Sequence, residues 1–212
     1  MKKSEVPKWK FVGGRVCLDF ANSVDARLEQ TVKNSTVFTF RADKLSDYPD
    51  LAEWAKEAGI LGERDAKRVV RLASQKEREA KQVLERATAL RESLFRIFKH
   101  TIEGRQPQSA DIELLNQECA IARNRQKLVY SSHKFAWNLE GGEDELDCMI
   151  WQIALSGAEL LSSEDLTLVR QCPGLNCGWL FLDSSRNRSR QWCDMRECGN
   201  LAKVRRFRER QP

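Results

Sequence analysis

Four cysteines near one end of this chain constrain its fold more than any other feature. They fall within 27 residues in the pattern C-x4-C-x15-C-x4-C, as Cys172, Cys177, Cys193 and Cys198. Two pairs of thiols at this spacing are typical of a four-cysteine zinc site, and disulfides or a redox-switching zinc thiolate are the less favoured alternatives. Pro173-Gly174, just after the first thiol, supplies a turn that brings the first pair together. We therefore expect one structural Zn²⁺ ion, enclosed by four thiolates and unable to activate water.

The positive charge of the chain is concentrated around the same cysteines. Residues 170–212 contain ten basic and four acidic residues, a balance of +6, whereas the other 169 residues sum to −1. Nine of these ten basic residues are arginines, whose planar guanidinium suits phosphate groups. This asymmetry divides the chain into a body, residues 1–165, and a basic tail, residues 166–212, and it favours a nucleic acid as the partner of the tail.

The body is predicted to be mainly helical. Apolar residues from Val83 to Ile102 recur at steps of three and four, which predicts a long amphipathic helix within 63–102, preceded by a separate shorter one. A strongly apolar run at 146–161 predicts the central helix of a bundle. Further helices are expected at 50–59 and from Ser109, a helix or a strand within 11–25, a short edge element or ordered loop at 34–40, and a hairpin of 127–131 with 134–139.

The tail is predicted to form a small β-hairpin followed by a helix. An Arg-rich turn at 184–189 would allow Trp179 to Trp192 to form the hairpin, and a further strand is expected at 166–170. A basic helix is expected at 199–210, with Leu201, Val204 and Phe207 facing inward. The expected fold class is therefore mainly α, a helical N-terminal domain with minor β-structure followed by a small treble-clef-like zinc finger of hairpin plus helix. Zinc would substitute for the core that about 40 residues can hardly build alone.

No catalytic constellation is apparent, so we do not expect an enzyme. The two histidines, His100 and His133, lie near no nucleophile or metal pattern, and His100 is expected at a solvated position near a helix end. Arg15, Asp19 and Asn22 form a polar cluster in the apolar segment 11–25. Because buried polar groups require partners, these three residues are expected either to satisfy caps and the core or to contact a small ligand.

The tail resembles the CGNR-type zinc finger, and the body resembles the ABATE domain that usually precedes it. In the tail the resemblance rests on the cysteine pairs, Phe181-Leu182-Asp183, Ser185-Arg186-Asn187, Trp192-Cys193 and Cys198-Gly199-Asn200. In the body it rests on Cys17-Leu18-Asp19-Phe20-Ala21-Asn22-Ser23, Leu51-Ala52-Glu53-Trp54 and Leu90-Arg91-Glu92-Ser93-Leu94. The resemblance implies a bacterial transcription regulator whose finger binds nucleic acid and whose body senses a signal or dimerises. Leu201 replaces the family's Arg after Cys-Gly-Asn, which either removes a phosphate contact or substitutes for the stem of a packing residue.

We therefore expect a DNA-binding transcription regulator. About five phosphate contacts would give a log–log salt slope of roughly −4 to −5. There are two alternatives. One is an RNA-binding protein in which Trp179, Phe181 and Trp192 stack on bases instead of forming the core, and the other is a protein-interaction adaptor. The sequence is compatible with a homodimer and does not identify a small-molecule effector. Because no apolar run is long enough for a membrane span, we expect no membrane partner and a cytoplasmic location. The candidate nucleic-acid contacts are Arg186, Asn187, Arg188, Arg190, Arg196, Asn200, Lys203, Arg205, Arg206 and Arg208, of which the two asparagines suit a turn or cap equally well.

Overall fold

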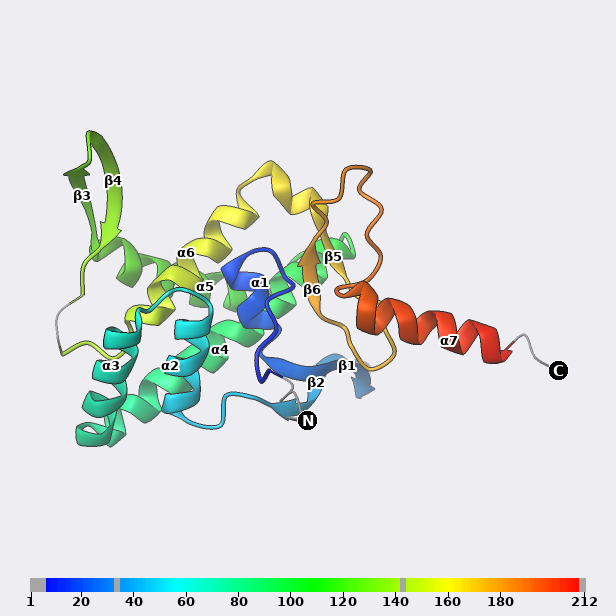
Figure 1. Ribbon diagram of the computed structural model, residues 1–212, viewed down its shortest axis with the longest axis horizontal. Helices are drawn as coiled ribbons and strands as arrows, with labels where there is room; N and C mark the ends of the chain where they lie inside the picture. The colour runs from blue at the N-terminus through cyan, green and yellow to red at the C-terminus, as the bar shows by residue number, and fades with distance from the viewer. Residues whose placement is uncertain (1–6, 33–34, 142–143, 210–212) are drawn as a thin grey trace, which may run out of the picture.

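The computed structural model describes residues 7–32, 35–141 and 144–209, and it confirms a mainly helical chain with small antiparallel hairpins (Figure 1). The body contains α1 (Val16–Ala21), β1 (Val24–Val32), β2 (Ser35–Asp43), α2 (Tyr48–Glu57), α3 (Glu63–Gln75), α4 (Glu77–Ile102), α5 (Ser109–Asn124), β3 (Gln126–Ser131), β4 (Lys134–Leu139) and α6 (Cys148–Leu161). The 3-10 turn η1 (Glu164–Leu168) crosses from the body into the tail, and the tail then contains β5 (Val169–Gln171), β6 (Leu180–Leu182), the π turn η2 (Met195–Gly199) and α7 (Asn200–Glu209).

Helix α4 is the centre of the body, as its apolar period predicted. Ala87, Leu90, Leu94 and Phe98 are fully buried along one face, in a core that α1, α2 and α6 complete. The predicted separate helix before α4 is also present, because the backbone at Lys76 leaves the helical region and divides α3 from α4. The same core includes Val169, Leu180 and Leu182 of the tail, so strands β5 and β6 are packed onto the body.

The segment 11–25 contains a helix and then the start of a strand. Helix α1 ends at Ala21, with Asn22 as its C-cap, and β1 follows at Val24 and pairs antiparallel with β2. The predicted edge element at 34–40 is thus part of a nine-residue strand, Ser35–Asp43, whose neighbour Asn34 lies outside the described residues. The hairpin predicted at 127–139 is confirmed as β3 and β4, paired from Gln126 with Leu139 to Ser131 with Lys134.

Three predictions about the tail are wrong. The strand expected at 166–170 begins only at Val169, because Glu164–Leu168 form the 3-10 turn η1. The hairpin does not run from Trp179 to Trp192, because β6 pairs with β5 around the first cysteine pair and residues 183–192 form a loop. Helix α7 has no inward face, since Leu201, Val204 and Phe207 are all exposed. Figure 1 shows the reason: α7 runs away from the body, so no described element covers its apolar stripe. The predicted helix also extended to Arg210, which lies outside the described residues.

The prediction for His100 is also wrong. This residue was expected at a solvated position, but its side chain is buried beside Phe38, with 6.1 Å between the ring centroids. The reason is that β2 covers the end of α4, a contact between segments about 60 residues apart that the helical period could not reveal. Among the described residues, no helix combines the length and the hydropathy that crossing a membrane requires.

Candidate metal centre and nucleic-acid interface

The four cysteines of the tail meet at one point. The Sγ atoms of Cys172, Cys177, Cys193 and Cys198 all lie within 4.8 Å of one another, and the Cys177–Cys193 and Cys193–Cys198 pairs are 3.5 and 3.7 Å apart. Zinc–thiolate bonds of about 2.3 Å in a tetrahedron place sulfurs roughly 3.8 Å apart. The donor set therefore fits one four-coordinate zinc ion, which would leave no coordination position for substrate or water.

The first cysteine pair is held by the loop between β5 and β6. The amide of Cys172 donates to the carbonyl of Trp179 at 2.8 Å, and the amide of Cys177 donates to the carbonyl of Gly174 at 3.0 Å. Gly174 lies against the sulfurs, so that a Cβ atom there would be 3.0 Å from Cys198 Sγ and 3.3 Å from Cys172 Sγ. A side chain at this position would therefore push the ligands apart.

The second cysteine pair lies where the chain enters the terminal helix. The Asp194 carboxylate accepts a hydrogen bond from the Arg196 amide at 2.7 Å and so caps the turn η2. Cys193 precedes this cap, Cys198 lies within the turn, and α7 begins at Asn200. The helix after the second pair is thus anchored to the metal site through its first turn, in agreement with the predicted order of ligand pair and helix.

Metal-free thiols this close cannot all ionise. Hydrogen bonds from Cys177 and Cys193 lower the pKa of Cys172, and the same contacts raise the pKa values of Cys177 and Cys193. Burial raises the pKa of Cys198, and the negative charge of Cys172 raises it further. A bound dication removes this limit because it stabilises every thiolate, so the cluster needs a cation to be fully deprotonated.

Most of the predicted nucleic-acid contacts lie on the exposed surface of the tail. They fall into two groups, one on the loop 183–192 and one on η2 and α7, and both lie toward the end of the molecule that carries α7 (Figure 1). Asn200 is exposed, and its amide donates to the carbonyl of Arg196 at 2.9 Å, a bond within the helix start. Arg205 pairs with Glu209 on the same helix. The exposed members are Arg186, Asn187, Arg188, Arg196, Asn200, Lys203, Arg205, Arg206 and Arg208.

Arg190 has a different place from the other predicted contacts. Its guanidinium stacks on Phe181, 4.5 Å from the ring centroid, and donates to the carbonyls of Leu182, Trp192, Cys193 and Val12. The last of these belongs to the body, so Arg190 joins the loop, the metal site and the N-terminal segment. Its donors are engaged within the protein, and we assign it to the scaffold and not to the exposed surface.

The polar cluster predicted in the segment 11–25 lies where the body meets the tail. Asn22 donates to the carbonyl of Leu180 at 2.7 Å and accepts from the amide of Leu180 at 2.8 Å, as a neighbouring strand would. Asp19 accepts a hydrogen bond from the Gly13 amide, and Arg15 forms an ion pair with Asp165. Asn22 and Asp19 thus form hydrogen bonds with backbone groups around the junction. Of the two predicted roles, these bonds correspond to satisfying caps and the core and not to contacting a small ligand.

Further contacts at this junction had no signal in the sequence. The Trp179 indole donates to the carbonyl of Val24 at 3.0 Å, and the Arg27 amide donates to the carbonyl of Cys177 at 2.7 Å. Gly178 permits this approach, because a Cβ there would lie 2.7 Å from the Arg27 carbonyl oxygen. The first ligand pair is therefore bonded directly to β1, a strand that the sequence did not predict at 24–32.

Asp19 should make the stability of the protein depend on pH. Burial raises the pKa of Asp19 to about 6. Hydrogen bonds from the amides of Gly13 and Val12 and the charge of Arg190 lower this pKa, but burial is the larger effect. Since an unfolded aspartate titrates near 3.9, the folded chain binds this proton more tightly, and the stability that it contributes is lost as the pH rises through about 6. Between pH 5 and 7 the free energy of unfolding should fall by about 1 kcal/mol more in the wild type than in Asp19→Asn.

This difference is measured by urea unfolding of both proteins, zinc-loaded, at each pH. Titration of the zinc thiolates is common to the two and cancels in the comparison. A gap between wild type and variant that stays constant from pH 5 to 7 would show that the Asp19 carboxyl is not held in an apolar environment.

Two family models match this chain in the order that the sequence predicted. A model described as "Putative stress-induced transcription regulator", the ABATE family, matches residues 14–164, and a model of the CGNR zinc finger matches residues 169–211. No curated protein matches the sequence. With the four clustered thiols, the second match supports a structural zinc ion in the tail.

Proposed function

This chain belongs to the ABATE family and ends in a CGNR zinc finger, and from that premise we propose that it is a transcription regulator that binds duplex DNA through its tail. In this proposal the zinc ion holds the loop 183–192 and helix α7 in place, and their cations contact phosphates. The body receives a signal or pairs two subunits. No enzymatic step is part of the proposal, because the zinc site is coordinatively closed.

The exposure of α7 is the observation that carries the proposal. None of its residues from Asn200 to Glu209 is buried, and the helix stands away from the rest of the molecule (Figure 1). The major groove of DNA admits an α-helix, and a free helix with cations along it suits that geometry. Lys203 and Arg206 lie three residues apart and so share a face, and Arg205 and Arg208 share a second face in the same way.

The charge balance also favours a polyanion. The tail carries +6 with its thiols counted as neutral, and a zinc ion with four thiolates adds −2, which leaves about +4. Arg186 and Arg188 on the loop extend the positive surface beyond α7. Electrostatic attraction of this kind supplies most of the sequence-independent affinity for DNA.

RNA binding by base stacking is less well supported. Trp179 and Phe181 are buried in a small core around Cys172 and Cys193, and Trp192 packs against it. Side chains in that position support the metal site, so they do not offer rings to unstacked bases. A protein-interaction adaptor has one observation in its favour, the exposed apolar stripe of Leu201, Val204 and Phe207 on α7.

The junction between body and tail offers a route for regulation. Asn22 binds both backbone groups of Leu180, and Arg27 and Trp179 bond the first ligand pair to β1. A change in the body that moves α1 or β1 would move the metal site with it. We include this coupling in the proposed mechanism as the means by which the body alters DNA binding.

Removing two cations from α7 tests the proposal. Lys203→Ala with Arg206→Ala should weaken duplex-DNA binding at least about 10-fold near physiological salt and reduce the log–log salt slope by about 2, because each phosphate contact contributes roughly 0.9. Fluorescence anisotropy across a salt series measures both quantities. Zinc content should stay at one per chain.

The matched control removes two exposed arginines at the other end of the molecule. Arg64→Ala with Arg71→Ala on α3 changes the net charge equally and should leave the affinity almost unchanged. If the two double variants weaken binding to the same extent, DNA responds to net charge alone, and the assignment of α7 as the contact surface is wrong.

A further inference from the structure

The hairpin of β3 and β4 stands out from the body at the end opposite α7 (Figure 1). Its register pairs Leu128 with Trp137 and Tyr130 with Phe135. Directly paired residues of an antiparallel hairpin lie on the same face, and residues two apart on a strand share that face. The four side chains therefore form one apolar face, here called the hairpin face.

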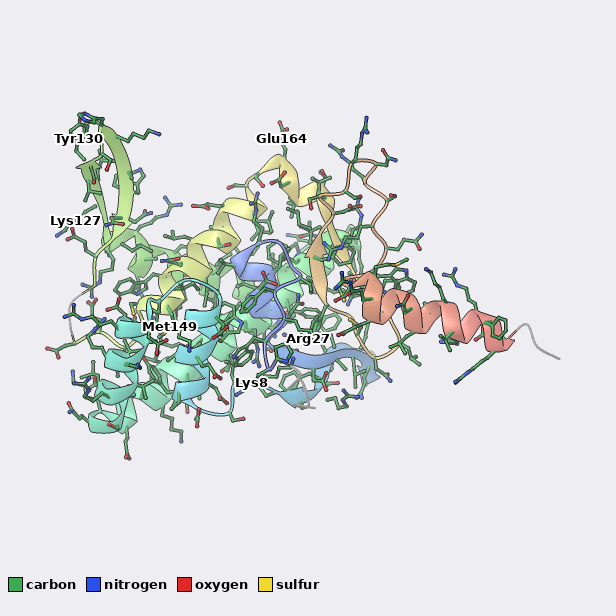
Figure 2. All side chains as sticks on the ribbon, viewed as in Figure 1. Lys8, Arg27, Lys127, Tyr130, Met149 and Glu164 are labelled. Carbon is green, nitrogen blue, oxygen red and sulfur yellow. The ribbon has the colours of Figure 1, made fainter. Side chains whose placement is uncertain are left out.

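The hairpin face is exposed over its whole length. Leu128 is 54%, Tyr130 62%, Phe135 70% and Trp137 66% exposed, and the Tyr130 and Phe135 rings touch, with centroids 4.9 Å apart. Figure 2 shows Tyr130 near the outer end of the hairpin, away from the helices. An aromatic face of this kind on a soluble protein marks an interaction surface.

The same face continues into the body at its base. Leu139, which follows Trp137 on this face, packs against the buried cluster of Ala122, Trp151 and Leu155. Beside Trp137 the surface is hollowed by about 660 Å³, between β4 and residues of α6 that include Gln152 and Glu159. The hairpin thus stands clear of the body, with room beside its apolar face for another element.

The hairpin also lacks cover along its edges. Its sheet has only two strands among the described residues, and a two-stranded hairpin is marginally stable at best in water without packing on one face. Its backbone edges can also pair with another strand. Both features indicate that the hairpin is completed by a partner.

A single-stranded nucleic acid would fit this face poorly. Stacking proteins combine aromatic rings with cations that follow the phosphates along the same groove. Here the register places Lys127 and Lys134 on the opposite face, and Lys127 is ion-paired with Glu140 at 2.6 Å. Figure 2 shows Lys127 well below Tyr130 on the hairpin. The hairpin face itself carries no charged side chain among its four members, which favours an apolar protein partner.

We infer that the partner is a second copy of this chain, with the two hairpin faces packed against each other about a two-fold axis. Since an aromatic side chain buries about 150–250 Å² when fully covered, the four residues leave roughly 500 Å² to cover on each copy. Two equal faces together bury roughly 1,000 Å², which is the lower limit for a specific interface. A partner without an apolar face of equal size would not reach it, whereas a second copy supplies that face by symmetry.

This dimer leaves the metal site and α7 free. The hairpin and α7 lie at opposite ends of the molecule, so pairing and DNA binding use separate surfaces (Figure 1). The inference rests on the proposed function in one respect, since it names the surface for the subunit pairing given there as one of two roles of the body, and its test by mass does not involve DNA. A regulator whose single finger buries little surface gains affinity from such pairing if both fingers reach the same DNA molecule, because the second contact is then intramolecular.

The test is the mass of the zinc-loaded full chain in solution, measured by sedimentation velocity from roughly 1 to 100 μM, the range in which a small interface of this kind associates. The wild type should pass from 24.5 kDa to twice that mass, while Phe135→Ser with Trp137→Ser should stay monomeric over the same range. Both substituted side chains are largely exposed, so the helical circular dichroism should not change. Loss of dimer with an intact fold supports the inference.

The matched control is Leu201→Ser with Phe207→Ser, which removes the other exposed apolar stripe, on α7. This variant should dimerise like the wild type. Three results would overturn the inference: a wild type that is monomeric throughout, a dimer that only the α7 variant disrupts, and, in a monomeric protein, quenching of tryptophan fluorescence by a single-stranded oligonucleotide that is lost when Trp137 alone is replaced by Phe. The last would make the hairpin face a base-stacking surface.

Discussion

Replacing Cys193 by Ser should abolish stoichiometric zinc binding and unfold the tail beyond β6. Cys193 Sγ lies 3.5 Å from Cys177 Sγ and 3.7 Å from Cys198 Sγ, so its loss removes one of the four ligands of the cluster. Free energies of zinc binding to such sites are largely free energies of folding, and the midpoint of thermal unfolding should fall by roughly 10 °C or more. Metal analysis and limited trypsin digestion, with arginines of the loop 183–192 as cleavage sites, measure the two effects.

The loss should reach the body only in part. Strands β5 and β6 share the core of α4, and Asn22 holds Leu180, so the helical circular dichroism of α2 to α6 should persist while the junction loosens. Cys148→Ser, which changes a half-buried thiol outside the cluster, is the matched control and should retain one zinc per chain. Stoichiometric zinc and a protease-resistant tail in Cys193→Ser would exclude a four-thiolate site.

Replacing Arg91 by Ala should cost about 2–3 kcal/mol of unfolding free energy, less than the roughly 3–5 kcal/mol for a fully buried ion pair because the Asp43 side chain is 30% exposed. Arg91 is 1% exposed and donates to both carboxylate oxygens of Asp43 at 2.7 Å. It also donates to Glu92 at 2.8 Å and stacks on Phe40. The variant therefore leaves a cavity, an unpaired Asp43 and a weakened contact between α4 and the β1–β2 hairpin.

Equilibrium unfolding in urea measures this loss. Arg78→Ala, an exposed position on the same helix, should change the stability by no more than about 0.5 kcal/mol. A cost below about 1 kcal/mol for Arg91→Ala would mean that Asp43 is solvated well enough without its partner, and that the Arg91–Asp43 pair does not hold the hairpin to the body.

The features that sequence reasoning predicted are those set by local pattern. The cysteine spacing predicted the metal site because each ligand pair needs only a short loop to bring its two thiols together. The apolar period predicted α4 because a single buried face is enough to set that period. The β3–β4 hairpin follows from the same logic, with two short alternating runs around a two-residue turn.

The features that it missed depend on contacts between distant segments. The Arg91–Asp43 ion pair joins residues 48 positions apart in the sequence, and the hydrogen bonds of Asn22 to Leu180 join residues 158 positions apart. Helix α7 has the apolar period of a packed helix, yet nothing in the described chain covers it. The apolar period of a helix indicates that one of its faces can be buried, but it does not indicate whether this chain or another molecule covers that face.

The tail hairpin was misplaced for a related reason. The apolar run at 178–183 does contain a strand, but its partner is β5 and not the segment before Trp192. Asp183 explains the end of the strand: its carboxylate accepts hydrogen bonds from the amides of Ser185 and Arg190, which closes the loop instead of extending a ladder. Short polar side chains compete with sheet bonding in this way.

The affinity of the zinc-loaded chain for random-sequence duplex DNA, measured across a salt series, shows whether zinc-dependent folding of the tail creates a surface for duplex DNA. We expect a log–log slope of about −4 to −5, tighter binding to duplex than to single-stranded DNA or RNA, and loss of binding when zinc is removed by a chelator. A zinc-loaded chain without affinity for duplex DNA, or one whose affinity survives zinc removal, would contradict this expectation.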